Sequence, residues 1–387
     1  MKNIKLMNKI AAVGTDCFDK RNYTVGEDVK NEDAIMVRSA ALHDLEFDPN
    51  LKAIARCGAG VNNIPIDRCS ENGIVVFNTP GANANGVKEL ALCALTLAAR
   101  DVIGGIKWAE TLGDDENAAK TVEKGKAAFA GTELMGKTLG VIGLGAIGGM
   151  VANTATHLGM KVVGCDPYMT VEAAWKISHS VQKAATYEDI YKVADYISLH
   201  VPATPTTKNM INAETLAMMK DGVKIINLSR ADLVNAEDMK AAIASGKVSK
   251  YVTDFPTPAT IGQKGIVNIP HLGASTAESE DNCAVMAAQQ LDLFLTTGTI
   301  KNSVNYPAVS LPYVGHSRVG VFHQNKPNLI SQITSAVSAM NINIENMANG
   351  SKGDNAYTLL EIDGDIPDSL VDAIQKIDSV SRVIAFA

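Results

Sequence analysis

The sequence contains little that would build a metal centre, a disulfide scaffold or a membrane span. Aromatic residues make up 5% of the 387 residues, and the six cysteines are scattered, without a Cys-x-x-Cys pair. This use of cysteine is typical of reduced thiols in a cytoplasmic protein, and we expect no metal. No run of about 20 apolar residues occurs, and the first residues lack a signal-length apolar core. We therefore expect a protein that is neither exported nor membrane-spanning.

Positive charge is also in short supply. The formal net charge is -7, the estimated isoelectric point is 5.6, and no block of lysine and arginine suggests a basic arm. These features argue against a nucleic-acid partner and favour a small molecule. What the chain does have is 46% hydrophobic residues in 387, enough for two or three domains with substantial cores.

Short apolar runs bounded by turn residues alternate with helical stretches along most of the chain, which predicts βα units around parallel sheets. In the first hundred residues the expected strands are Ile10–Val13, Ala34–Val37, Lys52–Ala55 and Ile74–Phe77. A second set is Leu139–Ile142, Lys161–Cys165, Tyr196–Leu199, Lys224–Asn227, Tyr251–Val252 and a short strand near Ile266. Long helices are expected at residues 86–100 and after Ser275, with a polar surface connection at 113–127.

The C-terminal part has a different rhythm. Residues 306–318 contain Pro307, Pro312 and Gly315 and suggest a linker, after which strand and helix patterns spell βαββαβ. That order is the ferredoxin-like arrangement of a small domain. The predicted fold is therefore α/β, with two doubly wound parallel-sheet domains and a ferredoxin-like third domain.

A glycine-rich turn in mid-chain carries the first chemical signal. Gly143, Gly145 and Gly148 form G-x-G-x-x-G, with Ala146 and Ile147 between the last two, directly after a predicted strand. By itself, such a pattern can also be a tight turn that has no ligand. Asp166, however, ends the next strand, at the spacing expected for a carboxylate on a ribose 2′-hydroxyl, so the pattern predicts a Rossmann-type site for NAD rather than NADP.

Two residues past predicted strand ends suit hydride-transfer chemistry. Arg230 could bind a carboxylate with its planar fork, and His271 is the best candidate for a general acid/base, although either could be structural. His200 is similarly placed, and we interpret it as structural or cofactor-lining.

Six motifs in order resemble those of the D-isomer-specific 2-hydroxyacid dehydrogenases. They are RCGAGVNN from Arg56, NTPGANANGVKEL, GLGAIG, HVPAT, NLSRADLV and PHLGAST. The resemblance covers nearly the whole chain. It implies a flavodoxin-like substrate domain split into residues 1–100 and 276–305, an NAD-binding domain at 101–275, a linker at 306–318 and a regulatory ACT-like domain at 319–387.

The resemblance also implies roles for individual residues. Arg230 would bind the substrate carboxylate and carbonyl, His271 would exchange the proton, and Asp254 would lie near the nicotinamide carboxamide. The implied substrate residues are Arg38, Arg56, Gly58, Ala59, Gly60 and Asn83, the two arginines for a phosphate and the three glycine-loop residues as an anion-binding nest of amides. As an alternative, the two arginines would form surface salt bridges.

One departure concerns the catalytic histidine. The family usually carries a glutamate shortly after the position of Asp254, and that glutamate pairs with the histidine. No glutamate occurs between Asp254 and His271 here. His271 is therefore expected to work without that carboxylate or with another partner.

The C-terminal domain resembles ACT domains that bind amino acids between paired copies. Within VFHQNKP, His323 and Asn325 resemble a serine-binding turn, and Asn343 stands where a second asparagine is expected. Asn328 occupies a position where glycine is common. Feedback inhibition by L-serine and a homodimer or homotetramer follow as hypotheses.

The reaction that the resemblance implies is the NAD-dependent oxidation of 3-phosphoglycerate to 3-phosphohydroxypyruvate. Two alternatives stay open: an enzyme for another 2-hydroxy acid, such as glyoxylate or glycerate, and a non-catalytic NAD-sensing protein. Arg38 and Arg56 favour a phosphorylated substrate.

Overall fold

The structure is a computed structural model that describes residues 1–312, 315 and 317–386. It divides into two compact units, Met1–Asn83 with Glu280–Ala387, and Ala84–Ser279. No helix in the described part of the chain is long and apolar enough to cross a membrane.

The first unit is built on a five-stranded sheet in the order β2-β1-β3-β4-β5, with every neighbouring pair parallel. Its strands are β1 (Lys2–Leu6), β2 (Tyr23–Gly26), β3 (Ala34–Val37), β4 (Ala53–Arg56) and β5 (Val75–Phe77), and its short helices are α1 (Ala12–Thr15) and α2 (Ile66–Glu71). The strand order 2-1-3-4-5 is that of flavodoxin-like sheets, as expected.

The predicted strand Ile10–Val13 is wrong. Residues 12–15 form α1 instead, and the buried residues Ile10, Gly14 and Phe18 recur every four positions, a spacing that suits one face of a helix and not of a strand. Gly14 packs so closely on Ala284 that a Cβ at Gly14 would lie 2.5 Å from the Ala284 Cβ. The first strand is Lys2–Leu6, whose only fully buried side chain is Ile4. The lysines of this strand interrupt the apolar pattern by which a strand is predicted from sequence.

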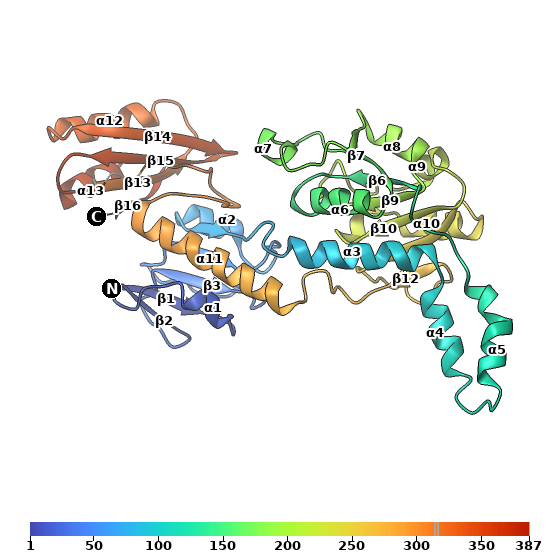
Figure 1. Cartoon of the computed structure of the whole chain (residues 1–387). Helices are drawn as coiled ribbons and strands as arrows, with labels where there is room; N and C mark the ends of the chain where they lie inside the picture. Colours follow the sequence, from blue (N-terminus) through green and yellow to red (C-terminus); the bar gives the residue numbers. More distant parts are fainter. Residues whose placement is uncertain (313–314, 316, 387) are drawn as a thin grey trace. The chain divides into compact units, whose positions relative to one another are not determined.

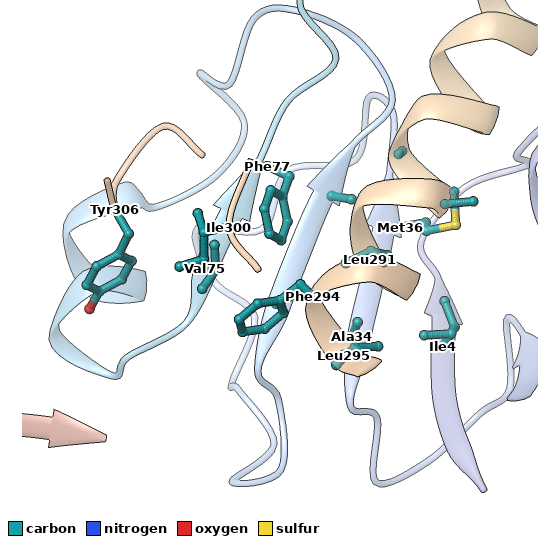
Figure 2. Packing of buried hydrophobic residues seen from close by; sticks show 14 of the residues in the cluster. Ile4, Ala34, Met36, Val75, Phe77, Leu291, Phe294, Leu295, Ile300 and Tyr306 are labelled. Atoms are coloured by element: carbon teal, nitrogen blue, oxygen red, sulfur yellow. The ribbon is translucent and has the colours of Figure 1, made fainter. Parts of the chain in front are cut away.

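Helix α11 (Ala277–Thr297) covers one face of this sheet. Figure 2 shows Leu291 and Leu295 of this helix beside Met36 and Ala34 of the strands, and Phe294 beside Phe77. The expected long helix after Ser275 is confirmed.

The second unit is built on a seven-stranded parallel sheet in the order β12-β11-β10-β9-β6-β7-β8 (Figure 1). Its strands are β6 (Thr138–Ile142), β7 (Lys161–Cys165), β8 (Gln182–Lys183), β9 (Tyr196–Leu199), β10 (Val223–Asn227), β11 (Val248–Thr253) and β12 (Ile266–Asn268). Strand order reverses between β6 and β9, as in a Rossmann fold, and ligands of such sheets bind beyond the strand ends at that point.

Helices cover both faces of this sheet. Helices α3 (Ala84–Ala99) and α6 (Ala146–His157) pack on one face, and α8 (Tyr187–Val193), α9 (Ala213–Met218) and α10 (Ala236–Ala244) pack on the other. The predicted first domain ran to residue 100, whereas α3 belongs to the second unit because its buried alanine face lies on α6, β10 and β11.

Residues 102–129 contain more helix than the sequence predicted. They form α4 (Val102–Glu110), α5 (Ala118–Gly125) and a 3-10 turn, η1 (Lys126–Phe129), where a surface connection was expected at 113–127. None of the three has a buried residue, so the connection is on the surface but helical. Figure 1 shows α4 and α5 projecting side by side. The remaining short helix, α7 (Val171–Ala174), follows β7.

The C-terminal module has the expected βαββαβ order. Its elements are β13 (Ser317–Gln324), α12 (Leu329–Ala339), β14 (Ile344–Lys352), β15 (Asn355–Ile362), α13 (Asp368–Gln375) and β16 (Val380–Phe386). The sheet is antiparallel, in the order β14-β15-β13-β16. Of the predicted linker, residues 313, 314 and 316 lie outside the described residues, as does Ala387.

This module does not stand apart from the first unit. Its two helices cover one face of its sheet, and the other face joins the core around α11, with the rings of Phe322 and Phe386 6.3 Å and 5.6 Å from that of Phe294. Tyr357 donates a hydrogen bond to the carbonyl of Gly298 at 2.8 Å. The module and the flavodoxin-like sheet therefore share one hydrophobic core.

Candidate active site

The glycine turn after β6 brings three chain segments together too closely for any side chain. A Cβ at Gly143 would lie 2.5 Å from the carbonyl oxygen of His200, and one at Gly148 would lie 1.9 Å from that of Gly143. Gly143 also has φ 88°, a left-handed conformation that favours glycine. The glycines at these two positions are therefore required by packing.

The middle glycine has a different role. Gly145 is the N-cap of α6, and a Cβ built on it would meet no atom within 4 Å. Open space therefore lies beside the first turn of the helix, which includes Ala146 and Ile147. The amides and dipole of a helix N-terminus favour an anion, so this turn fits a pyrophosphate.

Asp166 stands directly after β7, where the ribose of a dinucleotide is expected. Its Oδ2 accepts a hydrogen bond from the Leu144 amide and its Oδ1 accepts one from the Tyr168 amide, both at 2.9 Å. Beside it is a cavity of about 650 Å³, lined mainly by apolar residues that include Leu144, Met169 and Ile177. The carboxylate fits a ribose diol and the cavity fits a flat adenine ring.

The carboxyl ends of β10, β11 and β12, which are neighbours in the sheet, carry the next three predicted residues. Arg230 follows β10, Asp254 directly follows β11, and His271 follows β12. The His271 amide donates to the carbonyl of Asp254 at 3.0 Å, and His271 has φ 44°, unusual for a residue other than glycine. The fold thus brings these three residues together.

The loop that carries Arg230 is shaped by Asn227, a residue that the sequence analysis overlooked. This fully buried amide accepts a hydrogen bond from the Ser229 amide at 3.1 Å and donates one to the Arg230 carbonyl at 2.8 Å. The Arg230 guanidinium itself is exposed and donates to the carbonyl of Ser229 at 2.6 Å. The sequence feature that could have identified Asn227 is its position as a polar residue at the end of a buried strand.

Asp254 is buried with one oxygen unsatisfied. Its Oδ2 accepts a hydrogen bond from the Gly273 amide at 3.2 Å, whereas Oδ1 has no partner among the described residues. Burial raises the pKa of Asp254, and the Gly273 amide and the charges of His271 and Arg230 act in the opposite direction. A buried acceptor without a donor fits the amide group of a nicotinamide.

His271 has an aromatic neighbour rather than a carboxylate. Its ring lies 4.6 Å from that of Phe255, over which the Arg230 guanidinium lies at 5.8 Å. In the described part of the chain the His271 ring forms no hydrogen bond or ion pair. The absence of the glutamate could be predicted from the sequence, but the contact with Phe255 could not.

His200 lies at the point where strand order reverses. It directly follows β9, its amide donates to the Ile142 carbonyl at 2.8 Å, and its Nε2 is 2.8 Å from the Ser198 hydroxyl. Desolvation lowers the pKa of His200 to about 4, so the ring is neutral near pH 7. A neutral ring at this position lines the site without adding charge.

The first unit carries the predicted phosphate-binding arginines. Arg56 ends β4 and Arg38 follows β3 on the neighbouring strand, with Val37 and Arg56 in register. The side chain of Asn8 accepts hydrogen bonds from the amides of Arg38, Ser39 and Ala40 at 3.0–3.2 Å, which fixes the loop after β3. Arg38 forms an ion pair with Glu280 of α11.

The predicted anion-binding nest has two available amides rather than three. The Gly58 amide donates to the carbonyl of Arg56 at 2.8 Å, so it is already used. Ala59 and Gly60 keep amides without an acceptor among the described residues. Gly58 has φ 150°, and a Cβ there would collide with the Arg56 guanidinium. Asn83 is partly buried at the end of the first segment of this unit, directly before α3.

The three residues predicted to bind serine do not meet within the C-terminal module. His323 is buried, with Nδ1 2.8 Å from the carbonyl of Gln324 and Nε2 2.9 Å from the Thr358 hydroxyl. Asn325 follows the end of β13, whereas Asn343 precedes β14, whose first residues are level with the start of β13. These asparagines therefore lie at opposite ends of the sheet. Asn328 has φ 68°, which glycine and asparagine tolerate best.

The second unit thus combines a doubly wound sheet of the dinucleotide-binding type with an arginine, an aspartate and a histidine at three neighbouring strand ends. Residues 107–273 match the family model "D-isomer specific 2-hydroxyacid dehydrogenase, NAD binding domain". A protein of Schizosaccharomyces pombe, provisionally named D-3-phosphoglycerate dehydrogenase, is 32% identical over 383 residues, which cover 92% of this chain and 78% of that protein. The chain belongs to the family of D-isomer-specific 2-hydroxyacid dehydrogenases.

Two other relatives place the chain within the family. The D-3-phosphoglycerate dehydrogenase of Synechocystis is 35% identical over 294 residues, which cover 73% of this chain and 50% of that protein. The NAD+-bound 3-phosphoglycerate dehydrogenase of Entamoeba histolytica is 28% identical with a TM-score of 0.59, over 79% of this chain and 98% of that structure. The chain spans about half the length of several of the curated relatives that it matches.

NAD is the cofactor of this family's nucleotide-binding domain, and the residues of the second unit fit it. The turn at Gly145 has room for the pyrophosphate, Asp166 suits a free ribose 2′-hydroxyl and would repel a 2′-phosphate, and Asp254 keeps an acceptor for the nicotinamide amide. Bound NAD supplies the carbon that accepts or donates the hydride.

Proposed function

We propose that the protein oxidises 3-phospho-D-glycerate to 3-phosphohydroxypyruvate with NAD, the reaction that leads into serine synthesis. The observation that carries the proposal is the convergence of Arg230, Asp254 and His271 at the ends of three adjacent strands. The names of the relatives from Synechocystis and Entamoeba histolytica support the choice of substrate.

Each residue has a role that its chemistry suits. His271 removes the proton of the 2-hydroxyl, and Arg230 holds the substrate carboxylate and polarises the developing carbonyl oxygen. The ring of Phe255, in contact with both, limits where they point. Arg38 and Arg56 bind the phosphate, together with the amides of Ala59 and Gly60, and Asn83 contributes to the same substrate.

A second candidate is an NAD-dependent dehydrogenase of an unphosphorylated 2-hydroxy acid. The ion pair between Arg38 and Glu280 favours it, because a paired arginine has less positive charge to offer a phosphate.

Regulation and assembly belong to the same proposal. The C-terminal module, residues 319–387, is an ACT-like domain, and it binds L-serine between two copies of the chain. Because Asn325 and Asn343 lie at opposite ends of one sheet, a site containing both needs a second module. A homodimer or homotetramer provides one. The six free cysteines support a cytoplasmic location.

The test is the consumption of NADH with 3-phosphohydroxypyruvate by the wild type, His271→Ala and a control, His157→Ala, which alters an exposed histidine at the end of α6. We expect wild type and control to turn over at matching rates, and His271→Ala to lose at least about a hundredfold in kcat. Equal rates in all three proteins would contradict the role of His271. Turnover restricted to unphosphorylated 2-keto acids would favour the second candidate.

A further inference from the structure

Arg38, a predicted phosphate ligand, is bound to a carboxylate of its own protein. Its Nη2 lies 2.5 Å from Oε1 of Glu280, which is 242 residues away in sequence and belongs to α11. The two side chains are 44% and 41% exposed, so both remain accessible to a ligand. The proposed function assigns no role to Glu280.

Glu280 belongs to the same neighbourhood as both arginines. Arg38 and Arg56 stand at the ends of adjacent strands, and both lower the pKa of the Cys57 thiol, which burial raises to about 12. Arg38, Arg56 and Glu280 all act on the pKa of Cys283, one turn further along α11, with burial as the largest cause and Glu280 opposing the arginines. Two positive charges and one negative charge therefore share this part of the first unit.

The balance of these charges matters for a phosphorylated ligand. A phosphate monoester carries a charge of roughly −1.5 to −2 near pH 7 and forms its strongest contacts with the planar fork of an arginine. A carboxylate on the same guanidinium takes up part of that fork and repels the phosphate. An unphosphorylated substrate has no phosphate, so the carboxylate does not compete with it for the guanidinium.

We propose that Glu280 is a specificity-determining residue that competes with the phosphate of the substrate for Arg38. Glu280 weakens the binding of phosphorylated 2-keto acids and leaves the binding of their unphosphorylated counterparts unchanged. This inference rests on the proposed function for its substrate, but the competition for Arg38 applies to any phosphate ligand of this site.

The variant Glu280→Gln tests the competition, because glutamine keeps the shape of the side chain and a hydrogen-bond acceptor for Arg38 while removing the charge. We expect the KM for 3-phosphohydroxypyruvate to fall by roughly 1.5- to fivefold, the range for an exposed ion pair, with kcat unchanged. The KM for hydroxypyruvate, which lacks the phosphate, stays at the wild-type value. Glu278→Gln, an exposed position on the same helix, is the matched control and changes neither KM.

A simple positioning role predicts the opposite result. If Glu280 only holds Arg38 in place, Glu280→Gln raises the KM for 3-phosphohydroxypyruvate or leaves it unchanged, and the proposal is wrong. An equal fall in KM for both substrates overturns it as well, because the effect would not depend on the phosphate.

Binding of inorganic phosphate separates this inference from the proposed function. Isothermal titration of each protein with inorganic phosphate needs no turnover, and we expect Glu280→Gln to bind it more tightly than the wild type. The gain disappears in the double variant Arg38→Gln, Glu280→Gln. If 3-phosphohydroxypyruvate is not a substrate but this gain is found, the proposed function fails and the inference stands. If the substrate is turned over and no gain is found, the inference fails alone.

Discussion

The ring of His271 lies against the ring of Phe255, with the ring centres 4.6 Å apart and the planes inclined by 46°. Phe255 also lies under the guanidinium of Arg230, 5.8 Å from the ring centre. One aromatic side chain therefore contacts both residues that the proposed function places on the reacting atoms. Because the His271 ring has no hydrogen-bond partner in the described part of the chain, we expect its orientation to depend on this packing.

Replacement of Phe255 by alanine removes this support. We expect kcat with 3-phosphohydroxypyruvate to fall roughly tenfold, since a small displacement of a proton-transferring group lowers the rate strongly. Phe255→Leu, which keeps most of the bulk, is expected to fall less, and steady-state kinetics with NADH measures both. An alanine variant with an unchanged kcat would show that His271 is held by other contacts.

The sequence predicted the strands that are buried on both faces better than the others. Ala34–Val37 and Tyr196–Leu199 are continuous apolar runs because all four residues of each are buried, and the structure confirms both. β1 was missed because lysines flank Ile4 on this strand. The glycine turn and the strand-end positions of Arg230 and His271 follow from local pattern.

Contacts between distant parts of the chain could not be predicted from local pattern. Glu280 meets Arg38 across 242 residues, and Asn8 binds the loop after β3 from 30 to 32 residues away. Nothing in the composition of either segment marks these pairs, because they depend on how α11 and β1 pack on the same sheet. The shared core between the C-terminal module and α11 was missed for the same reason.

Asp254 is expected to lower the free energy of unfolding, although it contributes to the cofactor site. Because burial raises its pKa in the folded state, the folded protein binds more protons than the unfolded chain between the two pKa values. Stability from this group therefore falls as pH rises through that window, and the charged carboxylate is a burden at neutral pH. Asp254→Asn should raise the free energy of unfolding at pH 7 by roughly 0.5–2 kcal/mol.

The same substitution should weaken the cofactor site. We expect the KM for NADH to rise roughly tenfold, the loss of a charged hydrogen-bond acceptor. Urea unfolding at pH 7 and pH 4 measures the stability, with the gain of the variant shrinking at the lower pH. A variant that is less stable at pH 7 would mean that Asp254 is satisfied by a partner in solution.

The contribution of His200 to the free energy of unfolding is expected to change with pH in the opposite direction. Desolvation lowers its pKa to about 4 in the folded state, so the unfolded chain binds more protons between about pH 6.5 and pH 4. Stability is then lost as pH falls through this window, by about 1–3 kcal/mol for this group. In His200→Gln the loss between pH 7 and pH 4.5 should be smaller by that amount, measured by urea unfolding. His157→Gln, which changes an exposed histidine, should lose as much as the wild type.

The buried ion pair of the C-terminal module should matter more for stability than any surface pair. Arg318 and Glu361 are both fully buried and 3.4 Å apart, and Arg318 also donates to the carbonyls of Thr297 and Pro312 at 3.1 Å and 2.8 Å. Thr297 is the last residue of α11, so this one side chain ties the module to the helix that covers the flavodoxin-like sheet.

Removal of one partner leaves the other charge buried, which costs more than the pair contributes. We expect Glu361→Gln to lower the free energy of unfolding of the first unit by about 3 kcal/mol, whereas Arg21→Gln, which breaks an exposed pair with Asp19 in the same unit, leaves it close to the wild-type value. Replacing both partners, as Arg318→Met with Glu361→Leu, should recover much of the loss, since no uncompensated charge remains. Urea unfolding of the four proteins measures these differences. A double variant as unstable as Glu361→Gln would show that the hydrogen bonds of Arg318 to the backbone, rather than its pairing with Glu361, hold the module on α11.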